Sequence, residues 1–181
     1  MKLIKILFMV FSFFNTNSSS DLTSISFYDL SIKSIDGEKI DFKSFKGKNV
    51  LIVNVASYCG FTSQYKALEE LHSKYEDDLI VIGVPCNQFG GQEPNNEQQI
   101  QEFCEKNFGV TFLLTEKVDV KGKNQHILYK WLTSKNINNE IESSVKWNFQ
   151  KYFVDAKGKL VNYFLSTTSP TSSKIISLIE Q

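Results

Sequence analysis

Two apolar runs separated by one amphipathic segment constrain the fold of this 181-residue chain more than any other feature. Residues 50–56 read VLIVNVA and residues 79–84 read LIVIGV, and such runs are typical of strands buried on both faces of a sheet. Between them, residues 62–75 place apolar side chains at spacings of three and four, as an amphipathic helix does. This order predicts a β-α-β unit with parallel strands, and therefore an α/β fold.

Two further pairs of short segments predict β-hairpins. Residues 28–32 and 39–42 alternate between apolar and polar side chains and flank an Asp-Gly turn. Residues 152–154 and 160–164 flank a second turn that contains glycine. The first pair predicts an N-terminal hairpin. The second adds antiparallel strands, so the central sheet is expected to be mixed and flanked by helices.

Three more helices are expected along the chain. A polar, glycine-rich loop at residues 86–95 leads into a helix over residues 97–108. Another helix is expected to begin near Asn124. The last helix is expected to open at Ser169 and Pro170, with the serine as the N-cap and the proline in the first helical position.

The amino terminus has the pattern of a secretory signal. Residues 1–14 read MKLIKILFMVFSFF, a positively charged start followed by an apolar run that is shorter than the ~20 residues needed to span a bilayer. We expect a leader over residues 1–20 and a single domain over residues 21–181. The expected destination is the secretory pathway, the cell exterior, or an organelle reached through the leader. No stable membrane insertion is expected after its removal, and an N-terminal anchor is the alternative.

Composition excludes several classes of partner. The 20 basic residues balance the 20 acidic ones, and every basic residue is a lysine. A chain without net charge or arginine has little attraction for nucleic acid and cannot form bidentate guanidinium contacts, so no nucleic-acid partner is expected. With three cysteines, no CxxC pair and two histidines, we expect no metal site and no bound cofactor.

Cys59 is the strongest candidate for a reactive group. It follows the first buried run by three residues and precedes the expected helix by about three. Backbone amides and the positive end of a helix stabilise an anion at such a place, and the thiolate is the nucleophile toward peroxides and disulfides. The alternative is a buried structural thiol. His72 and His126 are expected to be structural, because neither lies in a polar motif that would pair it with Cys59 as in a cysteine hydrolase.

Three segments carry a resemblance to a known family. Residues 54–62 read NVASYCGFT and resemble the active-site segment of the glutathione peroxidase family. Residues 85–94, PCNQFGGQEP, and residues 146–149, KWNF, are similar to its second and third signatures. The resemblance covers about residues 28–179. It implies a thioredoxin-like fold and a hydroperoxide reductase in which Cys59 occupies the selenocysteine or cysteine position.

The same resemblance implies that Gln92, Trp147 and Asn148 complete a catalytic tetrad with Cys59. Amide and indole N–H groups can hold a thiolate and the departing oxygen without titrating themselves. Taken singly, the three residues would be read as a loop residue, a core aromatic and a turn former. Three neighbouring loop residues are interpreted only as shaping the loop: Asn87, Gln88 and Glu93.

The other cysteines differ in kind. Cys104 lies where cysteine-type, thioredoxin-dependent members of the resembled family carry a resolving cysteine, which would attack the sulfenic acid of Cys59 and form a disulfide. An inert position on the apolar helix face is the alternative. Because the two cysteines lie on different elements, the helix over residues 97–108 is expected to unwind partly to deliver Cys104. Cys86 is expected to be a buried, unreactive thiol and is a reserve candidate.

These observations predict a thiol peroxidase that reduces hydrogen peroxide and organic or lipid hydroperoxides in the response to oxidative stress. The absence of arginine disfavours a dedicated site for the carboxylates of glutathione, so a thioredoxin-like dithiol is the favoured reductant and glutathione the alternative. A redox sensor that passes its disulfide to a partner protein is the alternative function. We expect a monomer, because residues 131–146 lack the longer insertion of tetrameric relatives. Any cationic assistance to the thiolate is expected from Lys146.

Overall fold

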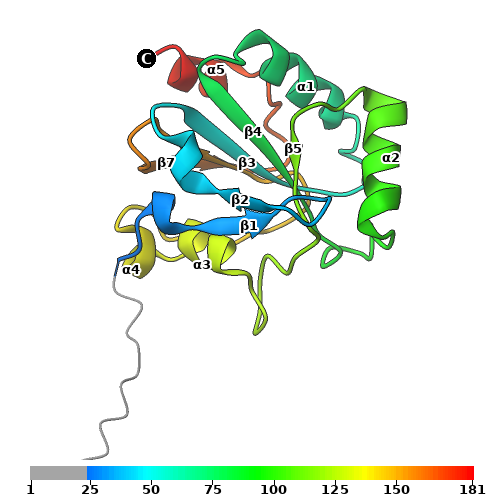
Figure 1. Ribbon diagram of the computed structural model, residues 1–181, viewed down its shortest axis with the longest axis horizontal. Helices are drawn as coiled ribbons and strands as arrows, with labels where there is room; N and C mark the ends of the chain where they lie inside the picture. Colours follow the sequence, from blue (N-terminus) through cyan, green and yellow to red (C-terminus); the bar gives the residue numbers. More distant parts are fainter. Residues whose placement is uncertain (1–23) are drawn as a thin grey trace, which may run out of the picture.

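The computed structural model describes residues 24–181, and the expected leader over residues 1–20 lies outside the described residues. A five-stranded sheet in the order β5-β4-β3-β6-β7 forms the centre of the domain (Figure 1). At its middle, β3 (Asn49–Val55) and β4 (Leu79–Pro85) run parallel, with α1 (Gln64–Lys74) connecting them. The predicted β-α-β unit is therefore confirmed.

The rest of the sheet confirms its mixed character. β6 (Lys151–Val154) pairs antiparallel with β3, and β7 (Leu160–Phe164) pairs antiparallel with β6. β1 (Ser31–Lys33) and β2 (Lys39–Asp41) form the predicted N-terminal hairpin. The remaining strand, β5 (Leu113–Leu114), was not predicted, because two residues are too few to show an alternating pattern.

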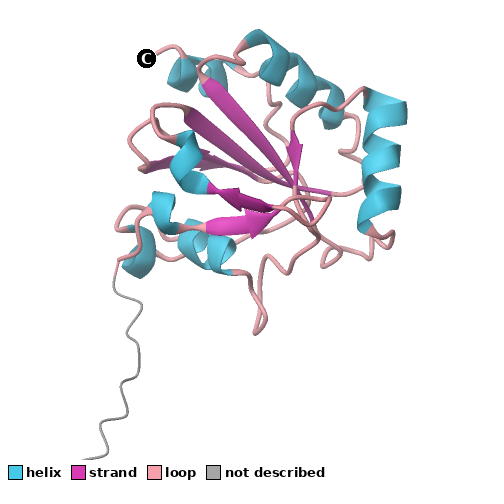
Figure 2. Cartoon of the chain, in the orientation of Figure 1, coloured by secondary structure: helices cyan, strands magenta, loops and turns pink. Residues whose placement is uncertain are grey.

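Helices cover both faces of the sheet (Figure 2). The helices are α2 (Glu97–Phe108), α3 (Ile127–Thr133), α4 (Lys135–Asn138) and α5 (Ser173–Ile179), with short 3-10 turns at Phe27–Asp29 and Phe42–Phe45. Alternate residues of β3 divide the core in two. Leu51 and Val53 pack with α1, α2 and α5, whereas Val50 and Ile52 pack with the hairpin and α3. Within residues 24–181, no helix combines the length and the apolar character needed to cross a membrane.

Two predicted helix starts were wrong by three residues. The last helix begins at Ser173 with Ser172 as its N-cap, and the predicted cap Ser169 lies in a turn in which its carbonyl accepts the Ser172 N–H at 3.1 Å. The other helix begins at Ile127 rather than near Asn124, because the imidazole Nδ1 of His126 caps it by accepting the Leu128 N–H at 3.2 Å.

Candidate active site

Cys59 lies in a series of turns between β3 and α1, five residues before the helix begins rather than the predicted three. Thr62 holds this segment together. Its hydroxyl donates to the Ala56 carbonyl at 2.8 Å and accepts the Cys59 N–H at 2.9 Å. Cys59 is 9% exposed, and its sulfur accepts the Phe61 N–H at 3.4 Å. The group that donates to the sulfur is therefore the N–H of a turn residue. The start of α1 lies further from Cys59 than the sequence predicted.

Gln92 and Asn148 meet beside this segment. The Asn148 side-chain amide donates to Gln92 Oε1 at 3.0 Å and to the Phe89 carbonyl at 3.4 Å. The Gln92 carbonyl accepts the N–H of Tyr58, the neighbour of Cys59, at 3.0 Å. Because both protons of the Asn148 amide are used, this side chain orients Gln92 and leaves the Gln92 Nε2 group as the available donor.

The turn that carries Trp147 and Asn148 is clamped by Asn54 on β3. The Asn54 side-chain amide donates to the Trp147 carbonyl at 3.0 Å, and the Asn54 carbonyl accepts the Phe149 N–H at 2.6 Å. These bonds hold Phe149 at a φ of 60°, in the left-handed region that non-glycine residues seldom adopt. Trp147 remains 40% exposed and packs against Phe89 with 5.7 Å between ring centroids. Asn54 was not predicted as a site residue, although it is a polar residue inside an apolar strand and the first residue of the NVASYCGFT segment.

Glu93 does more than shape the loop, which was the role predicted for it. Its side chain is fully buried, and its Oε2 accepts the hydroxyl of Ser57 at 3.1 Å. Burial raises the pKa of this carboxyl to about 7, while the Ser57 bonds act to lower it. Asn87 has the shaping role, because its side-chain oxygen accepts the Glu93 N–H at 2.9 Å. An ionisable group with a pKa near neutrality thus contacts Ser57, which precedes Cys59 by two residues.

All three cysteines are free thiols, and Cys59 is the most exposed of them. Cys104 is fully buried on the inner face of α2. The pKa of its thiol is raised to about 12, mainly by burial and also by the nearby Glu93 carboxylate, although the hydrogen bond with Tyr65 acts to lower it. Burial also raises the pKa of Cys86, whose sulfur accepts the Gln88 N–H at 3.4 Å. Cys104 therefore stays protonated and inaccessible while α2 is folded.

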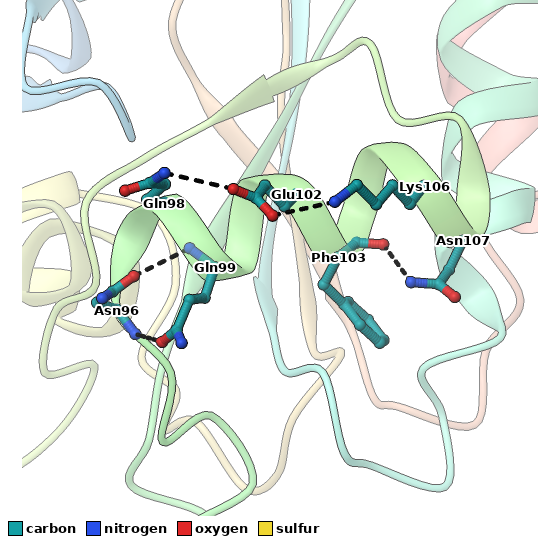
Figure 3. Close-up of polar contacts among 7 residues, drawn as sticks. All are labelled: Asn96, Gln98, Gln99, Glu102, Phe103, Lys106 and Asn107. Atoms are coloured by element: carbon teal, nitrogen blue, oxygen red, sulfur yellow. Dashed lines mark hydrogen bonds and ion pairs between the residues drawn. The ribbon is translucent and has the colours of Figure 1, made fainter.

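The outer face of α2 is held by local contacts that water can replace (Figure 3). Asn96 and Gln99 form a capping box. The side-chain oxygen of Asn96 accepts the Gln99 N–H at 2.9 Å, and the side-chain oxygen of Gln99 accepts the Asn96 N–H at 3.2 Å. Further along, Glu102 accepts from Gln98 at 3.3 Å and pairs with Lys106 at 3.1 Å (Figure 3). Exposed pairs of this kind contribute only ~0.3–0.5 kcal/mol each. α2 thus depends mainly on its cap and on the packing of its inner face.

Two lysines near the third signature have opposite environments. Lys146, from which cationic assistance was expected, is exposed. Lys151 on β6 is fully buried, and burial lowers the pKa of its ammonium group to about 7. Its Nζ donates to the side chain of Gln64 and to the carbonyls of Ser166 and Thr168. This burial was not predicted, since a lysine within a strand is usually exposed.

The fold and the site together define a class of protein. A mixed sheet of thioredoxin-like topology places one cysteine, 9% exposed, after its first central strand, and its sulfur accepts a hydrogen bond from a turn amide. This is the arrangement of a thiol oxidoreductase. Comparison with known proteins defines the family within that class.

The family model for glutathione peroxidase matches residues 27–133. The chain is 52% identical to glutathione peroxidase-like peroxiredoxin 2 of Saccharomyces cerevisiae over 148 residues, which cover 81% of this chain and 91% of that protein. It is 44% identical to the hydroperoxy fatty acid reductase gpx1 of Synechocystis over 149 residues, 79% of this chain and 88% of that one.

Solved structures agree with these matches. The apo crystal structure of Trgpx superposes with a TM-score of 0.67 at 38% identity, over 88% of this chain and 98% of that one. A secreted disulfide oxidoreductase of Mycobacterium tuberculosis shares the thioredoxin-like fold at 14% identity, with a TM-score of 0.57 over 83% of this chain and 93% of that one. The chain belongs to the glutathione peroxidase family, and it is a peroxidase.

Proposed function

We propose that Cys59 is the peroxidatic residue of a thiol peroxidase and that Gln92, Trp147 and Asn148 assist it. The observation that carries this assignment is the hydrogen bond between Asn148 and Gln92, which orients the Gln92 side-chain amide. The backbone carbonyl of Gln92 also accepts the N–H of Tyr58, the residue before Cys59. A side-chain amide donor can hold the departing oxygen of a peroxide without titrating. The exposed Trp147 ring brings an indole N–H to the same turn.

The reaction proceeds in three balanced steps. The Cys59 thiolate attacks one peroxide oxygen, so that an S–O bond forms, the O–O bond breaks, and the other oxygen leaves as an alcohol or water after taking a proton. The Cys104 thiol, exposed by unwinding of α2, then attacks the sulfenic sulfur; an S–S bond forms, the S–O bond breaks, and the hydroxyl group leaves as water with the proton that the thiol gives up. An external dithiol finally reduces the disulfide by exchange. Cysteine is oxidised by two electrons in the first step, and the dithiol supplies them in the last.

Three exposed apolar side chains bear on the substrate class. Tyr58, next to Cys59, is 57% exposed, Trp147 is 40% exposed, and Leu165 is 49% exposed. Ser166, the neighbour of Leu165, donates through its hydroxyl to the Asn148 carbonyl, so the three apolar side chains belong to segments joined at the site. Accessible apolar groups favour a bulky organic substrate over small peroxides alone. This supports fatty-acid or lipid hydroperoxides as substrates, in keeping with the name of the Synechocystis relative.

Turnover measurements test the assignment. The protein should reduce hydrogen peroxide and a fatty-acid hydroperoxide with thioredoxin as the electron donor, and Cys59→Ser should abolish both activities. Cys86→Ser is the matched control, since Cys86 is buried away from these steps, and it should retain activity. Faster turnover with glutathione than with thioredoxin, each at its physiological concentration, would contradict the proposed donor.

Two further parts of the proposal concern the whole protein. We propose a monomer, which sedimentation at micromolar concentration tests, and a stable tetramer would contradict it. We also propose that residues 1–20 direct the chain to the secretory pathway or an organelle. A C-terminally tagged protein that stays in the cytosol at full length would contradict this destination.

A further inference from the structure

Lys151 is an unusual feature of the described chain because its ammonium group is buried without a carboxylate partner. Its side chain is fully buried, and all three of its contacts are neutral oxygens, on Gln64, Ser166 and Thr168. Burying a charge without a counter-ion costs several kcal/mol before hydrogen bonds compensate it. An apolar residue would fill this position without that cost.

The contacts of Lys151 lead to the active site. Its Nζ lies 2.7 Å from the Thr168 carbonyl and 3.3 Å from the Ser166 carbonyl. The Ser166 carbonyl also accepts the Gln64 side-chain amide at 2.7 Å. Gln64 is the first residue of α1 and Ser166 lies after β7, so these two segments are hydrogen-bonded to each other as well as to Lys151. These bonds fix Ser166 in place.

Ser166 in turn contacts the residue that orients Gln92. Its hydroxyl donates to the Asn148 carbonyl, and the Asn148 side chain donates to Gln92 Oε1 at 3.0 Å. A continuous series of hydrogen bonds therefore runs from Lys151 through Ser166 and Asn148 to Gln92. Asn148 is followed by a residue in the left-handed conformation, which needs outside support to persist.

We propose that Lys151 is a positioning residue: its buried ammonium group fixes Ser166, which holds Asn148 and thereby the Gln92 amide. This inference rests on the proposed peroxidase function and adds a residue outside the tetrad to it. Lys151 does not touch the reacting atoms. Its removal therefore affects the step that uses Gln92 and leaves the intrinsic reactivity of the Cys59 thiolate unchanged.

Two rate constants measured on the same variant separate these effects. Oxidation of Cys59 by peroxide in a single turnover requires the oriented Gln92 amide, whereas alkylation by iodoacetamide requires only an accessible thiolate. For Lys151→Met and for Ser166→Ala we expect the ratio of the peroxide rate to the alkylation rate to fall about tenfold. Lys151→Arg, which keeps the charge and the donors, should restore part of the ratio. Lys157→Met, at an exposed lysine in the β6-β7 turn, is the matched control and should leave it unchanged.

Hydrogen exchange gives a readout that does not depend on activity. The Phe149 amide, bonded to the Asn54 carbonyl at 2.6 Å, should exchange faster in Lys151→Met and in Ser166→Ala than in the wild type. An unchanged rate ratio together with unchanged Phe149 exchange in Ser166→Ala would overturn the proposal. Because Ser166→Ala keeps the lysine, it provides this test even if Lys151→Met does not fold. A wild-type protein that does not react with peroxide would refute the proposed function, while the exchange result would still decide the role of Lys151.

Discussion

The side-chain amide of Asn148 donates to the side-chain oxygen of Gln92 at 3.0 Å and thereby determines which way the Gln92 amide faces. Asn148 donates its second proton to the Phe89 carbonyl, so it has none left for a substrate. In the proposed tetrad, one member therefore orients another.

A double-mutant cycle tests that relationship. Gln92→Ala should lower the rate of Cys59 oxidation by about 10²-fold, as loss of a donor to a developing charge does. Asn148→Ala should lower it by a smaller factor, because the Gln92 amide remains but turns freely. The double variant should be no slower than Gln92→Ala, since Asn148 acts through Gln92. Stopped-flow measurement of all four proteins gives the cycle, and fully additive losses would show that Asn148 acts independently.

The cap of α2 controls the resolving step if Cys104 is delivered by unwinding. Asn96→Ala removes half of the capping box and should destabilise α2 by about 1 kcal/mol, which corresponds to about fivefold faster formation of the Cys59–Cys104 disulfide. Gln98→Ala, which removes an exposed contact with Glu102, is the control and should have little effect. Quenched-flow mass spectrometry follows the disulfide.

Hydrogen exchange provides the direct test of unwinding. After one equivalent of peroxide, amides of residues 97–108 should exchange faster than in the reduced protein. A protein that carries the disulfide by mass but shows unchanged exchange over this range would rule out the unwinding mechanism.

Replacing Cys104 separates peroxide removal from disulfide relay. Cys104→Ser should lose turnover with thioredoxin while still consuming one equivalent of peroxide, because Cys59 reaches the sulfenic acid but no resolving thiol is present. Under mild peroxide, this variant should form mixed disulfides with thiols that reach the site. Recovery of thioredoxin alone would leave the relay function without support, and recovery of a distinct client protein would favour it.

Glu93 predicts a pH dependence of stability. Its pKa is raised to about 7 in the folded protein from an ordinary value of 4.5, so the folded state binds the proton more tightly than the unfolded state. The resulting stabilisation is complete below pH 4.5 and is lost as the pH rises through 7, by up to about 3 kcal/mol. Urea unfolding at pH 5 and pH 8 should show this loss in the wild type but not in Glu93→Gln. Glu76→Gln, at an exposed position, should behave as the wild type.

Much of the architecture could be predicted because the spacing of apolar residues along the sequence follows which face of a strand or helix is buried. The two β-branched runs predicted β3 and β4 to within a residue, and the helix over residues 97–108 matches α2 at both ends. Helix starts at 127 and 173 were missed because a histidine and a later serine supplied the caps. Several neighbouring residues have a similar propensity to be the N-cap of a helix, and tertiary packing determines which of them is used.

The site was less predictable than the fold. The ordered motifs placed Gln92 and Asn148 in one predicted site, and in the structure their side chains form a hydrogen bond. Asn54, Glu93 and Lys151 were missed or undervalued, because their importance comes from burial beside segments that are distant in sequence. A polar side chain in an apolar strand and a lysine in a strand are ambiguous signals, since exposure on a sheet face gives the same pattern.

The burial of Cys104 gives the resting enzyme a form of chemical protection. With its thiol unexposed and its pKa near 12, Cys104 is unavailable to alkylating agents, to stray disulfides and to peroxide itself. The folded α2 acts on this thiol as a protecting group does in chemical synthesis, and in the proposed cycle oxidation of Cys59 is the event that removes it. In the proposed cycle, the thiol that resolves the sulfenic acid is therefore kept inert until Cys59 has reacted.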